Sequence, residues 1–239
     1  MGAPEVQTPL EAAISDPWGT MSVILDGPLH PGGRDATAAL LDRADVGPGT
    51  QLLDVGCGTG EALTTTRERG GSAVGLDVDV LTDGIVRGDM CHLPFAEGRF
   101  DVVLAECVIC LSPDYPAALA EAARVLDHGG RLAFSDVVVE GEVPDLPPTM
   151  AEALCLTGDR DRGSVLDAIQ RAGFELAEVR SHRDDLLSMR DELAGAVDYE
   201  GLLALLGEPG RRALEGVQTL KAAVESDRLD YVSVVARLE

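Results

Sequence analysis

The fold of this chain is decided by one stretch, Gln51-Leu52-Leu53-Asp54-Val55-Gly56-Cys57-Gly58-Thr59-Gly60. Residues 51–55 form a short apolar run that is typical of a buried strand, and residues 61–69 have the pattern of a helix. The alternating glycines between them let the backbone turn tightly and pass close to a bound ligand. A strand, a glycine turn and a helix in this order predict the first βα unit of a doubly wound sheet.

The alternation of strands and helices continues to about residue 140. Further strands are expected at 72–76, 84–87, 100–106 and 131–139, and a helix at 117–126. The strands at 72–76 and 84–87 are separated by only seven residues, which is too few for the usual crossover helix. The pattern predicts a parallel α/β sheet with one shortened connection.

The remaining segments predict a cover over this sheet. Residues 1–45 contain irregular Pro- and Gly-rich sequence and are expected to form an N-terminal arm and cap. The core then spans 46–182, a helical insertion 183–228, and the final strand 229–239. We therefore expect one domain with a mostly helical cover.

Composition and charge exclude several classes of partner. The chain has 239 residues, of which 45% are hydrophobic and 26% charged, values typical of a folded domain. Forty-two acidic and 19 basic residues give a net charge of −23, which repels nucleic acids and anionic lipids. The N-terminus lacks the pattern of a signal peptide, and the most apolar stretch, 102–111, is interrupted by Glu106. We expect a cytoplasmic protein with a small-molecule partner, of open oligomeric state.

Asp54 followed by Gly56, Gly58 and Gly60 forms an acidic residue and an alternating glycine loop. This pattern resembles the first motif of the class I S-adenosylmethionine-dependent methyltransferases. The resemblance implies a Rossmann-like seven-stranded sheet and S-adenosylmethionine as cofactor. It places the glycine loop at the methionine part of the cofactor, Asp77 at the ribose hydroxyls, and Asp89 and Met90 at the adenine. The residues implied in cofactor binding are Asp54, Gly56, Gly58, Gly60, Asp77, Asp89 and Met90.

A narrower resemblance begins at Cys107-Val108-Ile109 and continues through Arg124-Val125-Leu126 and Ser135-Asp136-Val137. These segments are similar to arsenite methyltransferases, in which two cysteines bind trivalent arsenic; Cys107 and Cys155 match them. Soft ions such as As(III) prefer thiolate ligands. The resemblance implies methyl transfer to a soft acceptor, most readily a trivalent arsenical or a related metalloid or thiol, with no resident metal. Thr20 occupies the place of the family's third cysteine, which disfavours inorganic arsenite.

Alternatives remain open at this stage. Cysteine is among the most buried residue types, so Cys107 and Cys155 are also consistent with core packing. Glu106 is a candidate for contact with the cofactor and for catalysis. A small-molecule O-, N- or C-methyltransferase of secondary metabolism would need a base, with His30, His92 and Glu106 as candidates. A third hypothesis is a regulatory or scaffold protein that binds the cofactor without turnover.

Overall fold

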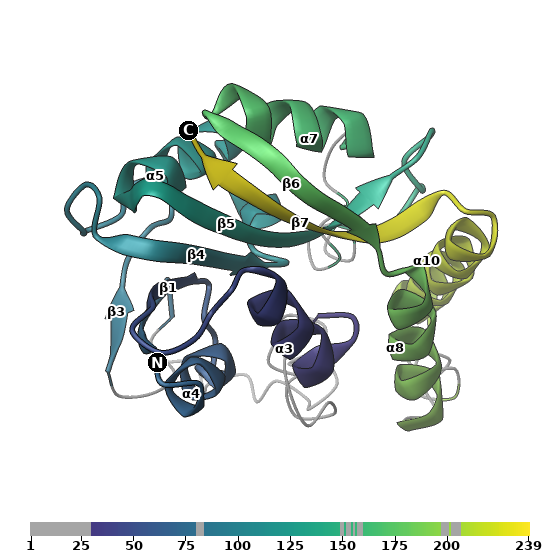
Figure 1. Cartoon of the computed structure of the whole chain (residues 1–239). Helices are drawn as coiled ribbons and strands as arrows, with labels where there is room; N and C mark the ends of the chain where they lie inside the picture. Colours follow the sequence, from purple (N-terminus) through teal and green to yellow (C-terminus); the bar gives the residue numbers. More distant parts are fainter. Residues whose placement is uncertain are drawn as a thin grey trace, which may run out of the picture.

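A computed structural model describes residues 30–79, 84–148, 151, 154, 156, 160–196, 201 and 207–239. Its centre is a seven-stranded sheet in the order β3-β2-β1-β4-β5-β7-β6 (Figure 1). The strands are β1 (Gln51–Val55), β2 (Ser72–Asp77), β3 (Ile85–Arg87), β4 (Phe100–Glu106), β5 (Leu126–Val139), β6 (Phe174–Ser181) and β7 (Leu229–Leu238). Strands β1 to β5 are parallel, whereas β7 runs antiparallel to both β5 and β6. The predicted Rossmann-like seven-stranded fold is confirmed.

Helices cover both faces of the sheet (Figure 1). They are α3 (Gly33–Arg43), α4 (Glu61–Glu68), α5 (Tyr115–Val125), α7 (Arg162–Arg171), α8 (Arg183–Ala196) and α10 (Glu208–Glu225), with a short 3-10 helix at Ile109–Leu111. Alternate residues of β4 point to opposite faces, as the period of a strand requires. Val102 and Leu104 pack in one core cluster with Leu41 of α3, and Val103 packs in the other with Leu119 of α5. The sheet is therefore buried on both faces, as its near-continuous apolar strands predict.

The connection between β2 and β3 is as short as the sequence indicates. Asp77 ends β2 and Ile85 begins β3, and the two strands pair in parallel. Residues 80–83 of this connection lie outside the described residues. The expected departure from an ordinary crossover is confirmed.

The C-terminal helices pack at one end of the sheet. Ala223 and Val224 of α10 form a small cluster with Val139 of β5 and Leu229 of β7. Helices α8 and α10 both fall within the segment 183–228. The division into arm, core and insertion stays a prediction, because residues 1–29 lie outside the described residues.

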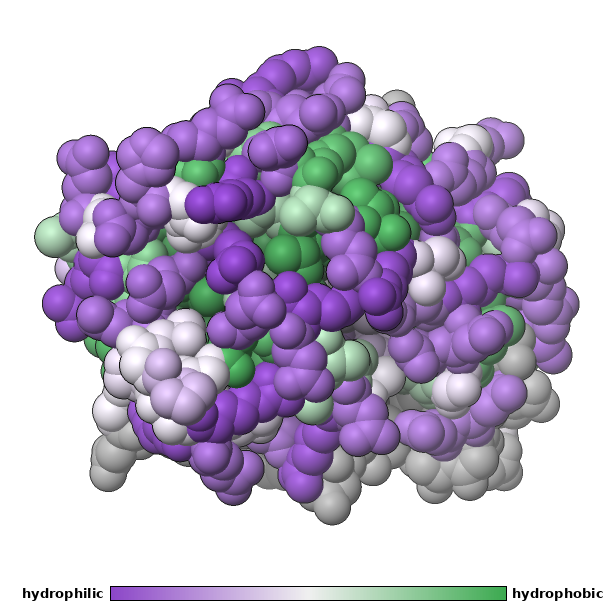
Figure 2. Space-filling view, viewed as in Figure 1, coloured by the Kyte–Doolittle hydropathy of each residue, from purple (hydrophilic) through white to green (hydrophobic). Residues whose placement is uncertain are grey.

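Hydrophilic residues cover most of the face seen in Figure 2, and hydrophobic residues gather near its middle. Among the described residues, Val78 and Leu111 are the large hydrophobic side chains that are exposed. Within the same part of the chain, no helix has the length and apolarity needed to cross a membrane.

Candidate functional site

The glycine loop packs tightly at one end and is open in its middle. Gly56, Gly58 and Gly60 all have positive φ angles, of 73°, 49° and 84°. A Cβ atom at Gly56 would lie 2.2 Å from Cγ2 of Val108, so the loop is in close contact with the segment that follows β4. A Cβ at Gly58 would meet no atom of the described residues within 4 Å. The loop thus has its closest contact beside β4 and free space above Gly58.

Asp77 lies at the mouth of this loop. Its Oδ2 accepts a hydrogen bond from the Gly58 N–H at 2.8 Å, and its Oδ1 accepts one from the Asp79 N–H at 3.0 Å. Each carboxylate oxygen has two lone pairs, so both oxygens keep capacity for a further donor. The arrangement fits the pair of ribose hydroxyls that the resemblance implies.

Carboxyl groups gather where the loop meets β4. Asp54 is only 5% exposed, and its pKa is raised well above its usual range by burial first and then by Glu106 and Asp77. Such a region stabilises a positively charged ligand, because a nearby cation offsets the repulsion between carboxylates. A cofactor with a positively charged sulfur, a sulfonium, fits this group of carboxyl side chains.

The segment after β3 holds the two residues implied at the adenine. Asp89 is exposed and accepts a hydrogen bond from the Cys91 N–H at 2.8 Å, and this bond is the first cause of its lowered pKa. Met90 is half-buried against the core. His92 lies on the surface, with its side chain 85% exposed beside Asp89. Of the three candidate bases, His92 is therefore the one on an open surface.

Glu106, at the carboxyl end of β4, is held by two residues from before β1. The hydroxyl of Thr37 donates to Oε2 of Glu106 at 2.9 Å, and Nε2 of His30 lies 3.1 Å from that hydroxyl and 3.7 Å from the same Oε2. Burial raises the pKa of Glu106, while His30, Thr37 and Arg43 lower it. The structure thus brings together two of the candidate bases, Glu106 and His30.

Cys107 follows in a strained backbone conformation. Its φ is 50°, in the left-handed region that non-glycine residues rarely adopt, and its N–H donates to the Ser135 carbonyl at 2.9 Å. The thiol is free, and its pKa is raised well above its usual range by burial first and then by Asp136 and Glu106. Cys107 is therefore a neutral thiol at neutral pH. Cys155 and Thr20 lie outside the described residues.

Asp136, which the sequence analysis named only within a motif, is a buried acid near the same strand ends. It is 1% exposed at the carboxyl-terminal part of β5, and burial raises its pKa to about 7, with Arg160 and the N–H groups of Val137 and Cys110 opposing the rise. An acid within the apolar run of this strand was the available signal, because a fully buried carboxyl rarely lacks a function.

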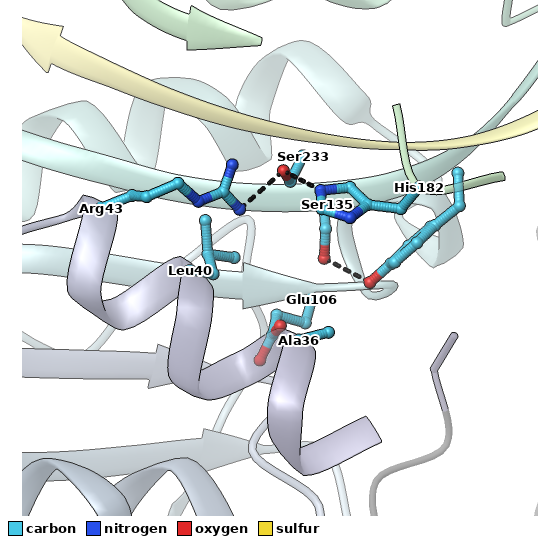
Figure 3. A pocket seen from close by; sticks show the side chains of 8 residues that line it. Ala36, Leu40, Arg43, Glu106, Ser135, His182 and Ser233 are labelled. Carbon is cyan, nitrogen blue, oxygen red and sulfur yellow. Dashed lines mark hydrogen bonds between the residues drawn. The ribbon is translucent and has the colours of Figure 1, made fainter. Parts of the chain in front are cut away.

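A small cavity with both polar and apolar lining residues lies on the α3 side of the same strand ends (Figure 3). It leaves about 10 Å³ for the centre of a water molecule. Its lining residues are Ala36, Leu40, Arg43, Glu106, Ser135, His182, Tyr231 and Ser233. Arg43 Nη2 donates to Ser233 Oγ at 2.8 Å, His182 Nε2 lies 2.7 Å from that oxygen, and Tyr231 donates to Ser135 Oγ at 2.7 Å. The lining residues come from α3, β4, β5, β7 and the residue before α8, which are far apart in the sequence.

Comparison with known proteins identifies the family. The family described as "Methyltransferase domain" matches residues 53–134. The methyltransferase GfsG of Streptomyces halstedii is 31% identical over 204 residues, which cover 77% of this chain and 73% of that protein. The chain belongs to the class I S-adenosylmethionine-dependent methyltransferases. It is an S-adenosylmethionine-dependent methyltransferase.

Other relatives of this methyltransferase differ in the activities for which they are named. The nocamycin O-methyltransferase of Saccharothrix syringae is 30% identical, covering 79% of this chain and 82% of that protein. The arsenite methyltransferase of Halobacterium salinarum is 28% identical and covers 61% of this chain and 46% of that protein. The arsenite relative is thus matched over a smaller part of both chains.

Solved structures show the same fold. The [4+2]-cyclase SpnF has a TM-score of 0.71 at 21% identity, covering 99% of this chain and 98% of that chain. Phosphoethanolamine N-methyltransferase 2 of Haemonchus contortus, in complex with phosphomonomethylethanolamine and S-adenosylhomocysteine, has a TM-score of 0.71 at 18% identity, covering 99% of this chain and 61% of that chain.

Proposed function

We propose that this methyltransferase acts on a hydroxyl oxygen of a small organic acceptor. The observation that carries the proposal is the surroundings of Cys107, whose thiol is kept neutral by burial and by the carboxyl groups of Asp136 and Glu106. A neutral thiol is a poor ligand for a soft ion, because the thiolate is the binding form. The name of the nocamycin O-methyltransferase, which matches 79% of this chain, also favours an organic acceptor.

The cofactor residues take the following roles in this proposal. Asp77 accepts the ribose hydroxyls through the lone pairs left by Gly58 and Asp79. The glycine loop, Gly56 to Gly60, contacts the methionine part, and Asp89 and Met90 border the adenine. When bound, S-adenosylmethionine supplies a methyl group on a positively charged sulfur.

The two buried carboxyl groups of Asp54 and Glu106 stabilise that positive charge. Both have raised pKa values, so a bound cation relieves a cost that the free protein carries. Thr37 and His30 hold Glu106 in place. In this proposal Glu106 therefore positions the cofactor and contributes the negative charge that stabilises its positively charged sulfur.

The segment 183–228 forms part of the cover over this site. The side chain of Asp185, in α8, lies against the loop before α3, since a Cβ at Gly32 would be 3.0 Å from its carboxyl group. Nδ1 of His182, directly before α8, lies 3.3 Å from the same carboxyl. The insertion and the N-terminal loop thus meet beside the residues that hold Glu106.

A second candidate function is the methylation of a trivalent arsenical. The observation that favours it is the free thiol of Cys107 at a strained position, together with the similarity to an arsenite methyltransferase. It requires Cys107 and Cys155 to act as thiolate ligands of the substrate. Metal binding would have to displace the proton that the surroundings of Cys107 retain.

The test is methyl transfer from labelled S-adenosylmethionine to a panel of phenols, aliphatic alcohols, carboxylic acids, thiols and trivalent arsenicals. We expect hydroxyl compounds to be labelled and Cys107→Ser to retain that activity. Cys91→Ser is the matched control, because Cys91 is a second free thiol with Sγ 3.1 Å from Ser112 Oγ. Labelling of arsenicals alone, lost in Cys107→Ser and kept in Cys91→Ser, would establish the second candidate instead.

A further inference from the structure

We propose that Asp136 and Tyr115 together bind the acceptor hydroxyl, with Asp136 taking its proton. This inference rests on the proposed function, and it adds that the acceptor is a neutral hydroxyl compound.

The sheet places Asp136 next to the cofactor loop. Strands β1, β4 and β5 are neighbours, and Gly56, after β1, is in close contact with Val108, after β4. Glu106 of β4 pairs with Ser135 of β5, so Asp136 lies one residue beyond that pair. Neighbouring strands are about 4.8 Å apart, which puts the carboxyl ends of β1 and β5 roughly 10 Å from each other. With the cofactor loop at the end of β1, the methyl group would lie over the end of β4 and the acceptor over the end of β5.

Two buried polar atoms, in the side chains of Asp136 and Tyr115, lack a hydrogen-bond partner among the described residues. Oδ1 of Asp136 accepts a hydrogen bond from the Val137 N–H at 2.9 Å, whereas Oδ2 is buried and has no hydrogen-bond partner among the described residues. The hydroxyl of Tyr115, the first residue of α5, is also buried and without a partner in that part of the chain. Buried polar atoms are nearly always paired, so two such atoms together point to a ligand that pairs them.

The two side chains share one electrostatic environment. The carboxyl of Asp136 contributes to the raised pKa of Tyr115, after burial, and Arg160 opposes it. The guanidinium of Arg160 lies 5.5 Å from the centre of the Tyr115 ring and donates to the Cys110 carbonyl at 2.7 Å. The Arg160 guanidinium therefore lies against the Tyr115 ring and also lowers the pKa of Asp136.

The chemistry of the pair suits a hydroxyl acceptor. The Tyr115 hydroxyl donates to the acceptor oxygen, and the acceptor O–H donates to Oδ2 of Asp136. The oxygen forms the bond to the methyl carbon, the carbon–sulfur bond breaks with its electrons remaining on sulfur, and the proton passes to Asp136. A carboxylate acceptor is disfavoured by repulsion from Asp136.

Other titratable groups face the Asp136 carboxyl. Cys107, directly after β4, and Tyr231 of β7 both have pKa values that the Asp136 carboxyl raises, and Arg160 lowers the pKa of Asp136 itself. A base is most effective when its pKa lies near the working pH, and burial brings this carboxyl there.

The test uses the full-length enzyme with a neutral phenol or alcohol that the panel identifies. We expect Asp136→Asn to lower kcat by about 100-fold or more, since a general base contributes about 10²–10⁴-fold. The wild-type kcat/KM should rise with pH to a plateau with a midpoint near 7. Asp136→Asn should lose this pH dependence, Asp136→Glu should restore part of the activity, and S-adenosylmethionine affinity should not change.

Tyr115→Phe is expected to raise KM for the acceptor about fivefold to 20-fold and to keep the pH midpoint, as loss of one hydrogen bond implies. Asp127→Asn is the matched control, because Asp127 is exposed at the amino-terminal part of the same strand and bonds to the adjacent His128 N–H. It should behave as wild type.

The outcomes separate this inference from the proposed function. If the wild type methylates hydroxyl compounds and Asp136→Asn keeps its kcat and pH midpoint, the inference is wrong and the proposed function stands. If only arsenicals or only carboxylic acids are methylated, the inference is also wrong. If Asp136→Asn does not fold, two other results still test the inference. It is wrong if the pH dependence of the wild-type kcat/KM has no midpoint near 7. It is also wrong if Tyr115→Phe leaves KM for the acceptor unchanged.

Discussion

Gly56→Ala is expected to destabilise the protein more than any comparable change in the glycine loop. Its φ of 73° costs a non-glycine residue about 1–2 kcal/mol. The new Cβ would also lie 2.2 Å from Cγ2 and 2.7 Å from Cβ of Val108, so one of the two segments must move. Forced overpacking of this kind costs about 1–3 kcal/mol. The expected loss is therefore about 2–5 kcal/mol.

Gly58→Ala is the matched control within the same loop. Its φ is also positive, at 49°, but its Cβ would meet no atom of the described residues within 4 Å. Only the backbone cost of about 1–2 kcal/mol applies. The difference between the two variants isolates the contact with Val108.

Thermal unfolding followed by circular dichroism measures this difference. For a domain of this size about 2–4 °C correspond to 1 kcal/mol, so Tm should fall by about 4–20 °C in Gly56→Ala and by about 2–8 °C in Gly58→Ala. In a Val108→Ala background, the effect of Gly56→Ala should shrink, because both Cγ atoms are absent. Equal Tm losses in the two glycine variants, or no coupling with Val108→Ala, would refute the close packing of the loop against Val108, in the segment that follows β4.

Three further predictions concern charged and polar groups. Asp77→Ala should weaken S-adenosylmethionine binding by about 10–100-fold in calorimetry, because a charged hydrogen-bond acceptor is worth about 1.5–3 kcal/mol; an unchanged affinity would contradict the ribose assignment. The raised pKa of Asp136 means that the folded protein retains a proton that the unfolded chain loses, so this group's contribution to stability falls as pH rises from about 4 to about 7, by up to about 4 kcal/mol. Asp136→Asn should accordingly melt above wild type at pH 8 and not at pH 4, and parallel Tm curves would show that the carboxyl is not buried as described. Tyr231→Phe removes the donor to Ser135 and should lower the free energy of unfolding by about 0.5–1.5 kcal/mol in urea titrations, whereas a stabilised variant would contradict that hydrogen bond.

Much of the fold follows from local sequence patterns. The strand 51–55, the glycine loop and the following helix were predicted within a residue of their observed bounds, because their apolar periods and glycine conformations depend on neighbouring residues alone. The short link between β2 and β3 was likewise evident from chain length. The position of Asp77 beside the glycine loop also follows, since parallel neighbouring strands end at the same edge of a sheet.

The placement of β7 between β5 and β6 was decided by tertiary structure. That antiparallel insertion brings Tyr231 and Ser233 to the ends of β4 and β5, more than 90 residues away in sequence. The contact of His30 and Thr37 with Glu106 arises in the same way, from the packing of α3 against the sheet.

The chemical states of Cys107 and Asp136 also depend on the fold. Sequence placed Cys107 just after a predicted strand and Asp136 within another. The same residue types nevertheless serve as thiolate ligand, core residue or base according to their surroundings. Burial raises the pKa values of Cys107, Glu106 and Asp136, and the charges of Asp136 and Glu106 raise that of Cys107 further. Arg160 opposes the rise at Asp136, and these influences act over distances that only the folded chain defines. The sequence by itself determined a cofactor-binding methyltransferase fold, and the tertiary structure decided which polar groups are buried together at the strand ends and how their pKa values shift.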